Sequence, residues 1–387
     1  MISFLSRLFI KNRDRVTDAR VREAYGTLCS IVGIALNILL FAGKYFAGVI
    51  SGSIAISADA FNNLSDAGSS LVTLLGFRLA GKQPDSEHPY GHGRMEYISG
   101  LVVSMFIILM GFELGKSSVE KIIHPVPLEV GWLPMAILLA AICVKLYMFL
   151  YNRAIGKKIS SSAMFATATD SLSDCVATGV VLVSTLIARF WGVNIDAYAG
   201  AAVSLFILYS GVNAAKDTLA PLLGQPPEPE FVKNITALVM AHPEIHGVHD
   251  LIVHDYGPGR AMVTLHAEVD GKSDIFHLHE VIDHIEFEIF RSFGCVATIH
   301  MDPVDTENKV ISKLKDDVAA LLKTIDERLT IHDFRVSPGK SHINLLFDAV
   351  IPYDFRLTDE ETIKEIQLLV YENYPGYFAH VTIDHAE

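Results

Sequence analysis

The sequence predicts an α-helical membrane bundle of six transmembrane helices, followed by two tandem α+β cytoplasmic domains. Six long apolar stretches, an abrupt change in charge after residue 223 and a repeat within the second half all point to this fold. Residues 1–223 contain 18 Lys and Arg and 15 Asp and Glu, whereas residues 224–387 contain 13 and 29 and hold 13 of the 16 histidines. The chain therefore joins an apolar half of small positive charge to an acidic, histidine-rich half.

Composition excludes several other classes of protein. Hydrophobic residues make up 51% of the 387 residues, which is too many for a disordered chain. Four cysteines are too few for a disulfide-rich scaffold. A net charge of −13 argues against a nucleic-acid partner, because phosphate binding requires a basic face.

The first half contains six apolar stretches of the length that a bilayer requires, about 20 residues. They are Thr27–Val49, Ile54–Leu79, Ile98–Leu114, Trp132–Tyr151, Ser162–Phe190 and Ala197–Ala215. Lys and Arg gather in residues 1–23 and in every second connection, and this bias places both ends of the chain in the cytoplasm of a multi-pass cell-membrane protein. Lys44 and Lys145 fall inside spans, and we expect their side chains to reach a membrane surface.

The second and fifth spans carry carboxylates that lipid does not tolerate. A charged group at the bilayer centre costs about 2.5–3.5 kcal/mol even on the most lenient scale. Asp66 lies in the second span, and Asp170 and Asp174 lie in the fifth. These side chains must therefore face one another, a cation or water.

Spacing places the polar residues of these two spans at one depth. Asn62 and Asp66 are four residues apart, as are Asp170 and Asp174, so each pair shares a helix face. Both pairs lie roughly 12–18 Å from a membrane surface, near the middle of the hydrocarbon core. Four oxygen donors at one depth predict a tetrahedral cation site, although polar residues also join helices in membrane bundles. Asp59, one turn away, is either an exit-path ligand or a structural, water-facing carboxylate.

The connection after the second span combines metal-ligand residues with glycines. It reads Gln83-Pro84-Asp85-Ser86-Glu87-His88-Pro89-Tyr90-Gly91-His92-Gly93. Asp85, His88 and His92 could ligate one metal ion, because imidazole and carboxylate are zinc-type ligands. The alternative is that these histidines only pack or form hydrogen bonds.

The second half is duplicated. Val248-His249-Asp250 recurs 83 residues later as Ile331-His332-Asp333, and Thr298-Ile299-His300 resembles Thr382-Ile383-Asp384. Each copy is predicted to run helix, strand, strand, helix, strand, which is typical of an open antiparallel sandwich of the ferredoxin type. The predicted domains are residues 1–23, 24–223, 224–304 and 305–387.

Together these features resemble the cation diffusion facilitator family. The resemblance rests on six spans, polar residues four apart in spans two and five, the Gln-Pro-x-x-x-His-x-x-Gly-His-Gly loop, and a tail with His-Asp-Leu and His-x-Asp-Pro. It implies a homodimer, not an enzyme, that exports a divalent metal from a bacterial cytoplasm in exchange for protons by alternating access. It implies no prosthetic group; the metal is substrate and possible regulator.

The resemblance also assigns three groups of metal-binding residues. They are Asn62, Asp66, Asp170 and Asp174 in the membrane; Asp85, His88 and His92 in the loop; and His249, His266, His279, His300 and Asp302 in the tail. We expect metal in the tail to draw acidic faces of the dimer together and to raise transport. In the second copy, Phe347 aligns with His266 and Ala386 with Asp302, so we expect that copy to lack a metal site and to be structural, dimer-extending or regulatory.

Ligand chemistry favours Mn²⁺ as the transported ion. The membrane quartet offers only oxygen donors, which suit Mn²⁺, Mg²⁺ or Ca²⁺, whereas Zn²⁺ prefers a site with nitrogen or sulfur. Zinc-selective relatives commonly have histidine at the position of Asp170 and aspartate at that of Asn62, so the sequence resembles the manganese-type bacterial branch. Zn²⁺ and Fe²⁺ are the alternatives.

Other classes of function remain to be separated from a carrier. A membrane-bound metal sensor would bind metal without transport, and a channel would conduct metal without a proton requirement. An intramembrane aspartyl protease also needs paired aspartates, but neither Asp66 nor Asp170 follows the Gly-x-Gly run of such enzymes.

Overall fold

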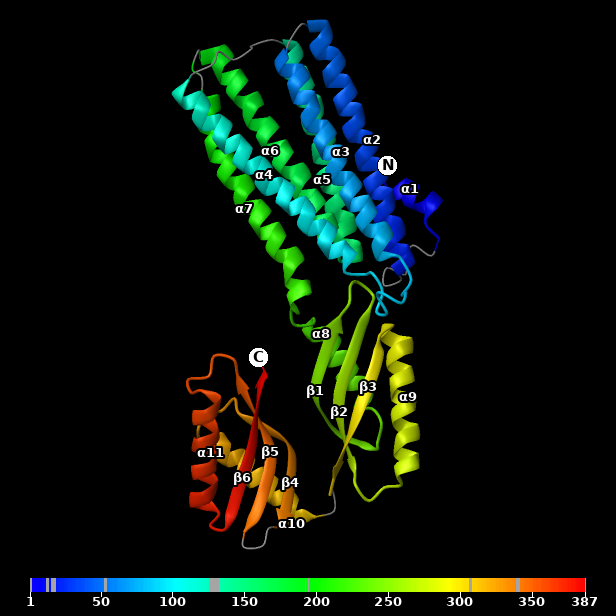
Figure 1. Ribbon diagram of the computed structural model, residues 1–387, viewed down its shortest axis with the longest axis vertical. Helices are drawn as coiled ribbons and strands as arrows, with labels where there is room; N and C mark the ends of the chain where they lie inside the picture. Colours follow the sequence, from blue (N-terminus) through cyan, green and yellow to red (C-terminus); the bar gives the residue numbers. More distant parts are fainter. Residues whose placement is uncertain are drawn as a thin grey trace. The chain divides into compact units, whose positions relative to one another are not determined.

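The computed structural model describes residues 2–11, 14, 19–51, 54–124, 132–191, 193, 195–305, 308–338 and 342–386 (Figure 1). The chain forms two compact units. The first comprises Met1–Pro226 and His254–Ala261, and the second comprises Pro227–Val253 and Met262–Glu387.

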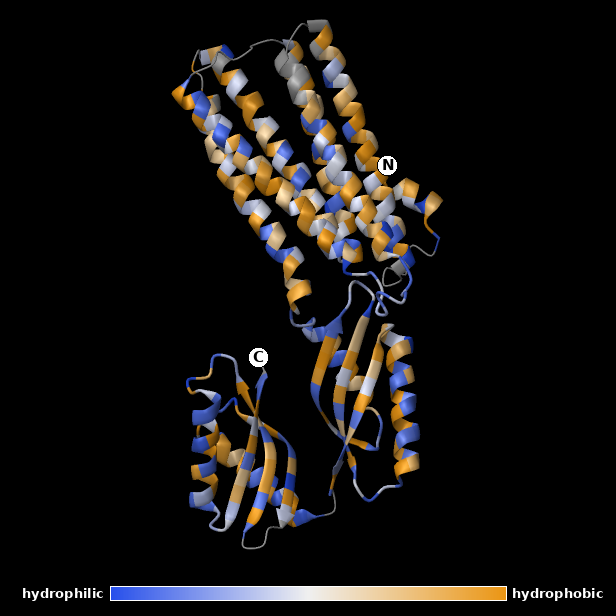
Figure 2. Cartoon of the chain, in the orientation of Figure 1, coloured by the Kyte–Doolittle hydropathy of each residue, from blue (hydrophilic) through white to orange (hydrophobic). Residues whose placement is uncertain are grey.

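The first unit is a bundle of six long helices preceded by the short helix α1 (Ile2–Phe9). The long helices are α2 (Ala19–Ser51), α3 (Ile54–Ala80), α4 (Met95–Ile123), α5 (Trp132–Ile159), α6 (Ser162–Trp191) and α7 (Asp196–Leu223). Apolar residues predominate along them in Figure 2. Five are long and apolar enough to cross a membrane; α3 falls short of that hydropathy over its described residues because polar side chains interrupt it. The predicted helical membrane bundle is confirmed.

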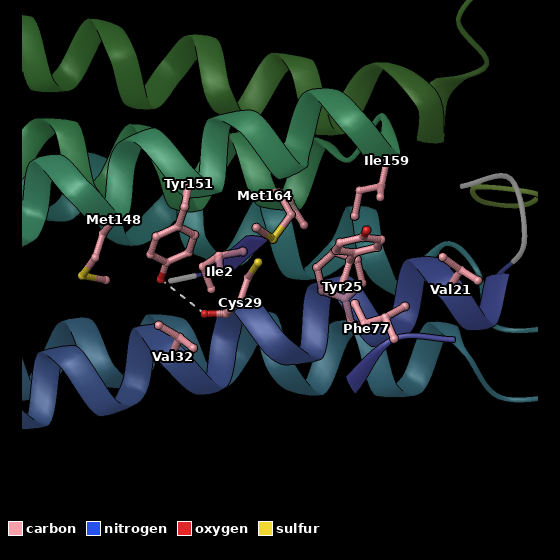
Figure 3. Packing of buried hydrophobic residues seen from close by; sticks show 12 residues of the cluster. Ile2, Val21, Tyr25, Cys29, Val32, Phe77, Met148, Tyr151, Ile159 and Met164 are labelled. Atoms are coloured by element: carbon pink, nitrogen blue, oxygen red, sulfur yellow. Dashed lines mark hydrogen bonds between the residues drawn. The ribbon is translucent and has the colours of Figure 1, made fainter. Parts of the chain in front are cut away.

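The bundle packs tightly where α2 meets α3 and α5 (Figure 3). Tyr25 and Phe77 are fully buried there, and the hydroxyl of Tyr151 on α5 donates to the carbonyl oxygen of Cys29 at 3.3 Å. A Cβ atom on Gly26 would lie 2.2 Å from the ring of Phe77, so the close approach of α2 to α3 requires glycine.

Gly26→Ala is therefore expected to lower the melting temperature of the purified protein in detergent. Overpacking a close-packed core costs about 1–3 kcal/mol, because the ring of Phe77 must move. Gly43→Ala is the matched control, since it lies on the same helix and an added Cβ there meets no described atom within 4 Å. Equal melting temperatures for the two variants would contradict the packing described here.

The second unit contains the two copies of the repeat, each built as helix, strand, strand, helix, strand. The first copy is α8 (Pro229–Val239), β1 (Ile245–Asp255), β2 (Ala261–Asp270), α9 (Ile275–Phe293) and β3 (Val296–Val304). The second copy is α10 (Lys309–Leu322), β4 (Thr330–Pro338), β5 (Ile343–Pro352), α11 (Asp359–Asn373) and β6 (Tyr377–Ala386). The two three-stranded sheets have the orders β1-β2-β3 and β4-β5-β6.

Each sheet contains a parallel pair of strands, and the prediction of antiparallel sheets is wrong. In the second copy β4 and β5 pair antiparallel, whereas the central strand pairs parallel with the last strand in both copies. The reason is the helix between those two strands, because a strand–helix–strand crossover returns the chain in the same direction.

Strand register corrects the alignment of the two copies. The inward-facing residues of β2 are Val263, Leu265, Ala267 and Val269, and those of β5 are Leu345, Phe347, Ala349 and Ile351. Matching them places His266 at the position of Asp348, not of Phe347. An offset of one residue would set the outward His266 against an inward Phe347, because side chains alternate along a strand.

The same register fixes the last strand of each copy. His266 pairs with His300 in the first sheet, as Asp348 pairs with Thr382 in the second. Two residues further along, Glu268 pairs with Asp302, as Val350 pairs with Asp384. Asp302 therefore corresponds to Asp384 and not to Ala386. The predicted matches of His266 with Phe347 and of Asp302 with Ala386 are therefore wrong. His332, Asp348 and Asp384 occupy the positions of His249, His266 and Asp302, whereas Thr382 stands at the position of His300. The expected loss of the metal site from the second copy stays a prediction.

Candidate metal centres

Two buried aspartates of the membrane bundle and a third, partly buried aspartate surround one lysine. Asp66 on α3 and Asp170 on α6 are each 4% exposed. Lys145 on α5 places its Nζ 2.7 Å from Asp66 Oδ2 and 2.6 Å from Asp174 Oδ2. Asp170 interacts electrostatically with the two other carboxylates and with the ammonium. Helices α3, α5 and α6 thus meet at a single charged centre.

The expectation that the two membrane lysines reach a surface is wrong. Lys145 is 3% exposed and lies at the middle of α5, about 20 Å from either end of that helix. Lys44 is also buried, and its charge acts on Asp66. A buried ammonium persists in low dielectric only where carboxylates compensate it, and Asp66 and Asp174 provide that compensation for Lys145.

Asn63, the residue next to the predicted ligand Asn62, forms a hydrogen bond with Asp66. Its side chain is buried, and its Nδ2 donates to Asp66 Oδ2 at 3.3 Å. Asn62 is exposed, because consecutive residues of a helix are turned by about 100° from one another. Spacing alone favoured position 62, and the role of Asn62 as a ligand stays a prediction.

Two oxygen atoms of this centre are available to a cation. Asn63 Oδ1 and Asp170 Oδ1 are buried and have no hydrogen-bond partner among the described residues. Leaving a buried acceptor unpaired costs about 1–3 kcal/mol, which a bound metal ion would recover. The donor set therefore suits an oxygen-preferring divalent cation. Asp59, the predicted exit-path residue, has a side chain outside the described part of the structure.

The loop between α3 and α4 brings its three predicted ligands together. Asp85 Oδ1 lies 3.6 Å from His88 Nδ1, Asp85 Oδ2 lies 3.4 Å from His92 Nε2, and the two imidazole centroids are 4.6 Å apart. The backbone N–H groups of His88 and Glu87 donate to Asp85 and lower its pKa, which keeps the carboxylate ionised. His92 Nδ1 is buried and makes no hydrogen bond within the described residues. Metal binding by this group stays a prediction.

Sequence reasoning missed the segment that holds this loop. Residues His254–Ala261, between β1 and β2, belong to the same compact unit as the membrane helices. Arg94 donates to the carbonyl oxygen of Asp255 at 2.6 Å, Arg260 donates to that of Lys82 at 2.7 Å, and Tyr90 stacks on Tyr256 with centroids 4.4 Å apart. These partners are more than 150 residues apart in the chain, so no local pattern could have paired them.

In the first copy of the tail, three predicted histidines converge on one carboxylate. His249 Nε2 and His266 Nδ1 lie 3.1 Å and 2.9 Å from Asp302 Oδ2, and His300 Nε2 lies 3.4 Å from Asp302 Oδ1. The described residues do not bring His279 to this group. It lies exposed on α9, where its Nδ1 is 3.4 Å from Asp283 one turn along the helix.

Comparison with known proteins places the chain in a family. Residues 30–223 match the family model described as cation efflux transmembrane domain, and residues 227–304 match that of the cation efflux protein cytoplasmic domain. The chain is 33% identical to an uncharacterised transporter of Methanocaldococcus jannaschii over 280 residues, 72% of this chain and 97% of that protein.

Two further relatives are cation-efflux pumps named FieF. The protein of Klebsiella pneumoniae is 29% identical over 287 residues, 73% of this chain and 95% of the pump. That of Salmonella arizonae is 27% identical over 299 residues, 76% of this chain and 99% of the pump. The relatives are thus matched almost completely, while about a quarter of this chain is left over and both family models end by residue 304. With its helical membrane bundle and α+β tail, the chain belongs to the cation diffusion facilitator family of divalent-cation efflux transporters, a family of transporters and not of enzymes.

Proposed function

We propose that this protein exports a divalent metal cation, Mn²⁺ by preference, from the cytoplasm in exchange for protons. The observation that carries the proposal is the buried centre at which Asp66, Asp170 and Asp174 surround Lys145. Three carboxylates at the middle of a bilayer need positive charge, and a divalent ion provides more of it than one ammonium.

Lys145 acts as a tethered cation in the metal-free site. Its Nζ bonds Asp66 and Asp174, two of the oxygens that a metal ion would take. An arriving ion must displace the ammonium from these carboxylates, and a departing ion allows it to return. The lysine therefore keeps the empty site electrically compensated while the carrier changes conformation.

Proton exchange drives the metal outward. Carboxylates must be deprotonated to bind metal, so metal entry on the cytoplasmic side releases protons and proton entry on the outer side expels metal. The bundle would rock to expose the site to each side in turn. Exporting two charges against about 100 mV costs roughly 4.6 kcal/mol, so transport without proton coupling would run inward.

The surroundings of the carrier follow from charge and from the tail. We propose a multi-pass protein of a bacterial cell membrane with both ends in the cytoplasm, because Lys and Arg concentrate on that side. We propose that it functions as a homodimer joined through its tail. Metal bound by Asp302 and the three histidines around it would draw the acidic tails of the dimer together. Transport would then rise when cytoplasmic metal is high.

Flux into sealed vesicles tests this function. Purified protein in liposomes should accumulate Mn²⁺ when a pH gradient is imposed and should stop when the gradient is collapsed. Uptake that persists without the gradient would indicate a channel. Binding without any uptake would indicate a sensor, and either result would contradict the proposal.

Asp170→His is expected to shift selectivity from Mn²⁺ toward Zn²⁺. The substitution replaces an oxygen ligand with imidazole nitrogen, and nitrogen ligands favour zinc. The measurement is the ratio of Zn²⁺ to Mn²⁺ uptake when both ions compete in the same vesicles. Asp217→His, at an exposed position of α7, is the control and should leave the ratio unchanged. An unchanged ratio in an active Asp170→His protein would refute selectivity by ligand type.

A further inference from the structure

The second copy of the tail lies beyond both matched family models, and it gathers several ligand-type side chains around His332. His332 on β4 places its Nε2 3.2 Å from Asp384 Oδ2 on β6 and 3.5 Å from Asp250 Oδ1 on β1 of the first copy. Its Nδ1 lies 3.8 Å from Asp348 Oδ2 on β5. One ligand atom from each of these four residues lies within 4.8 Å of all the others.

The fold builds this cluster from strands rather than from one flexible segment. All three strands of the second sheet contribute a residue, and β1 of the first copy contributes the fourth. Asp250 and Asp333, each directly after the equivalent histidine, both adopt left-handed backbone conformations with φ of 50° and 47°. Aspartate tolerates that conformation better than most residues do. Each copy thus bends its first strand at the same point.

A buried imidazole of the first copy, whose Nε2 makes no hydrogen bond within the described residues, lies beside the cluster. The side chain of His249 is 8% exposed, and its ring stacks on that of His332 with centroids 4.5 Å apart and planes at 25°. His249 Nε2 forms no hydrogen bond with any described residue; the nearby Asp302 oxygen lies at ion-pair distance but outside hydrogen-bond geometry. His332 Nδ1 is also without a hydrogen bond from the described residues, although it lies 3.8 Å from Asp348 Oδ2. Nitrogen atoms left in this state are costly unless something binds them.

Among the described residues, all three carboxylates of the cluster share His332 as an ion-pair partner. Asp250, Asp348 and Asp384 bring three negative charges around one imidazole. Like charges at this separation repel, and a divalent cation would remove that repulsion and accept the imidazole as a ligand.

We propose that Asp250, His332, Asp348 and Asp384 bind a divalent transition-metal ion, which thereby links the two copies of the tail within one chain. One imidazole and three carboxylates suit Zn²⁺, Mn²⁺ or Fe²⁺. The second copy then contacts the first copy through this site, where the ring of His332 stacks on that of its counterpart His249. This site does not depend on whether the membrane centre transports metal.

Metal content of the full-length protein in detergent tests the site. Wild type, His332→Ala and Asp348→Asn are saturated with Zn²⁺ or with Mn²⁺, freed of loosely held ions by gel filtration and analysed for bound metal. Each variant should hold one ion fewer per chain than wild type. His380→Ala is the matched control, because His380 is an exposed histidine on β6 paired with Asn344 and lies outside the cluster.

The rise in melting temperature on adding metal is a second measurement, and it distinguishes loss of the metal site from loss of folding. Saturating metal should raise the melting temperature of wild type and of His380→Ala more than that of either variant, because an ion that binds only the folded state stabilises it. Both variants should melt cooperatively without metal. If His332→Ala and Asp348→Asn, folded by this criterion, bind as many ions as wild type, the proposal is overturned. If only one folds, its ion count decides. Proton-driven Mn²⁺ flux tests the membrane centre separately.

Discussion

Asp174→Asn in α6 is expected to reduce metal flux to the level of empty vesicles. The substitution removes a charged ligand from the membrane centre and one of the two hydrogen-bonded carboxylates that hold Lys145. Removing one partner of a buried ion pair costs about 3–5 kcal/mol. We expect the bound metal ion to lose binding energy too, because it depends on the same carboxylate. Asp66→Asn is expected to have the same effect, because Asp66 is the other partner of Lys145.

The measurement is Mn²⁺ uptake by liposomes under an imposed pH gradient, normalised to protein incorporated. Asp217→Asn serves as the control, since Asp217 is an exposed aspartate of α7. It should transport as wild type does. Wild-type flux in Asp174→Asn would show that metal crosses the membrane by a route that avoids this centre.

Lys145→Met is expected to strengthen metal binding and to slow the conformational change of the metal-free carrier. Without the tethered ammonium, Asp66 and Asp174 are left buried with their main counter-charge gone, a cost of about 3–5 kcal/mol. The metal-free variant should therefore melt at a lower temperature than wild type. Added Mn²⁺ should raise that temperature more than it does in wild type, because the ion no longer competes with the lysine.

The maximal rate of Mn²⁺ uptake should fall although the affinity for Mn²⁺ rises. We expect Lys145→Met to reach half-maximal uptake at a lower Mn²⁺ concentration but with a lower maximal rate, since the empty site must now change conformation without compensation. Lys157→Met, an exposed lysine of the same helix, is the control. If metal stabilised wild type and Lys145→Met equally, the ammonium would not compete with the ion.

The sequence predicted the membrane half well wherever a single energetic argument dominates. The cost of burying charge in lipid identified Asp66, Asp170 and Asp174 as residues that must meet, and the structure places them around one centre. The loop residues Asp85 and His88 were predicted because they are close in the chain, so a short turn necessarily brings them near one another.

The partners of those residues were less predictable, because they depend on how helices rotate and pack. Whether Asn62 or Asn63 turns toward Asp66 is a matter of one residue on α3. The sequence alone also allowed the Lys145 side chain to extend to a membrane surface. Only the packing of α5 beside α3 and α6 places it next to Asp66 and Asp174. A lysine at the middle of a span opposite buried carboxylates was the signal available in the sequence.

The tail shows the same limit for strands. The repeat was recognised from His249 and His332, but strand register was misjudged by one or two residues, which hid the equivalence of Asp302 and Asp384. Pairing between strands distant in sequence is fixed by inward-facing residues across the whole sheet, such as Leu265 and Phe347, and not by a short matching motif.

The most direct test of the central claim is to locate Mn²⁺ in crystals of the protein by its anomalous scattering. The account predicts a peak within the membrane bundle in contact with carboxylate oxygens of Asp66, Asp170 and Asp174, with the Lys145 ammonium moved away from Asp66 and Asp174. Mn²⁺ density only outside the bundle, with Lys145 still bridging Asp66 and Asp174 at saturating metal, would contradict it.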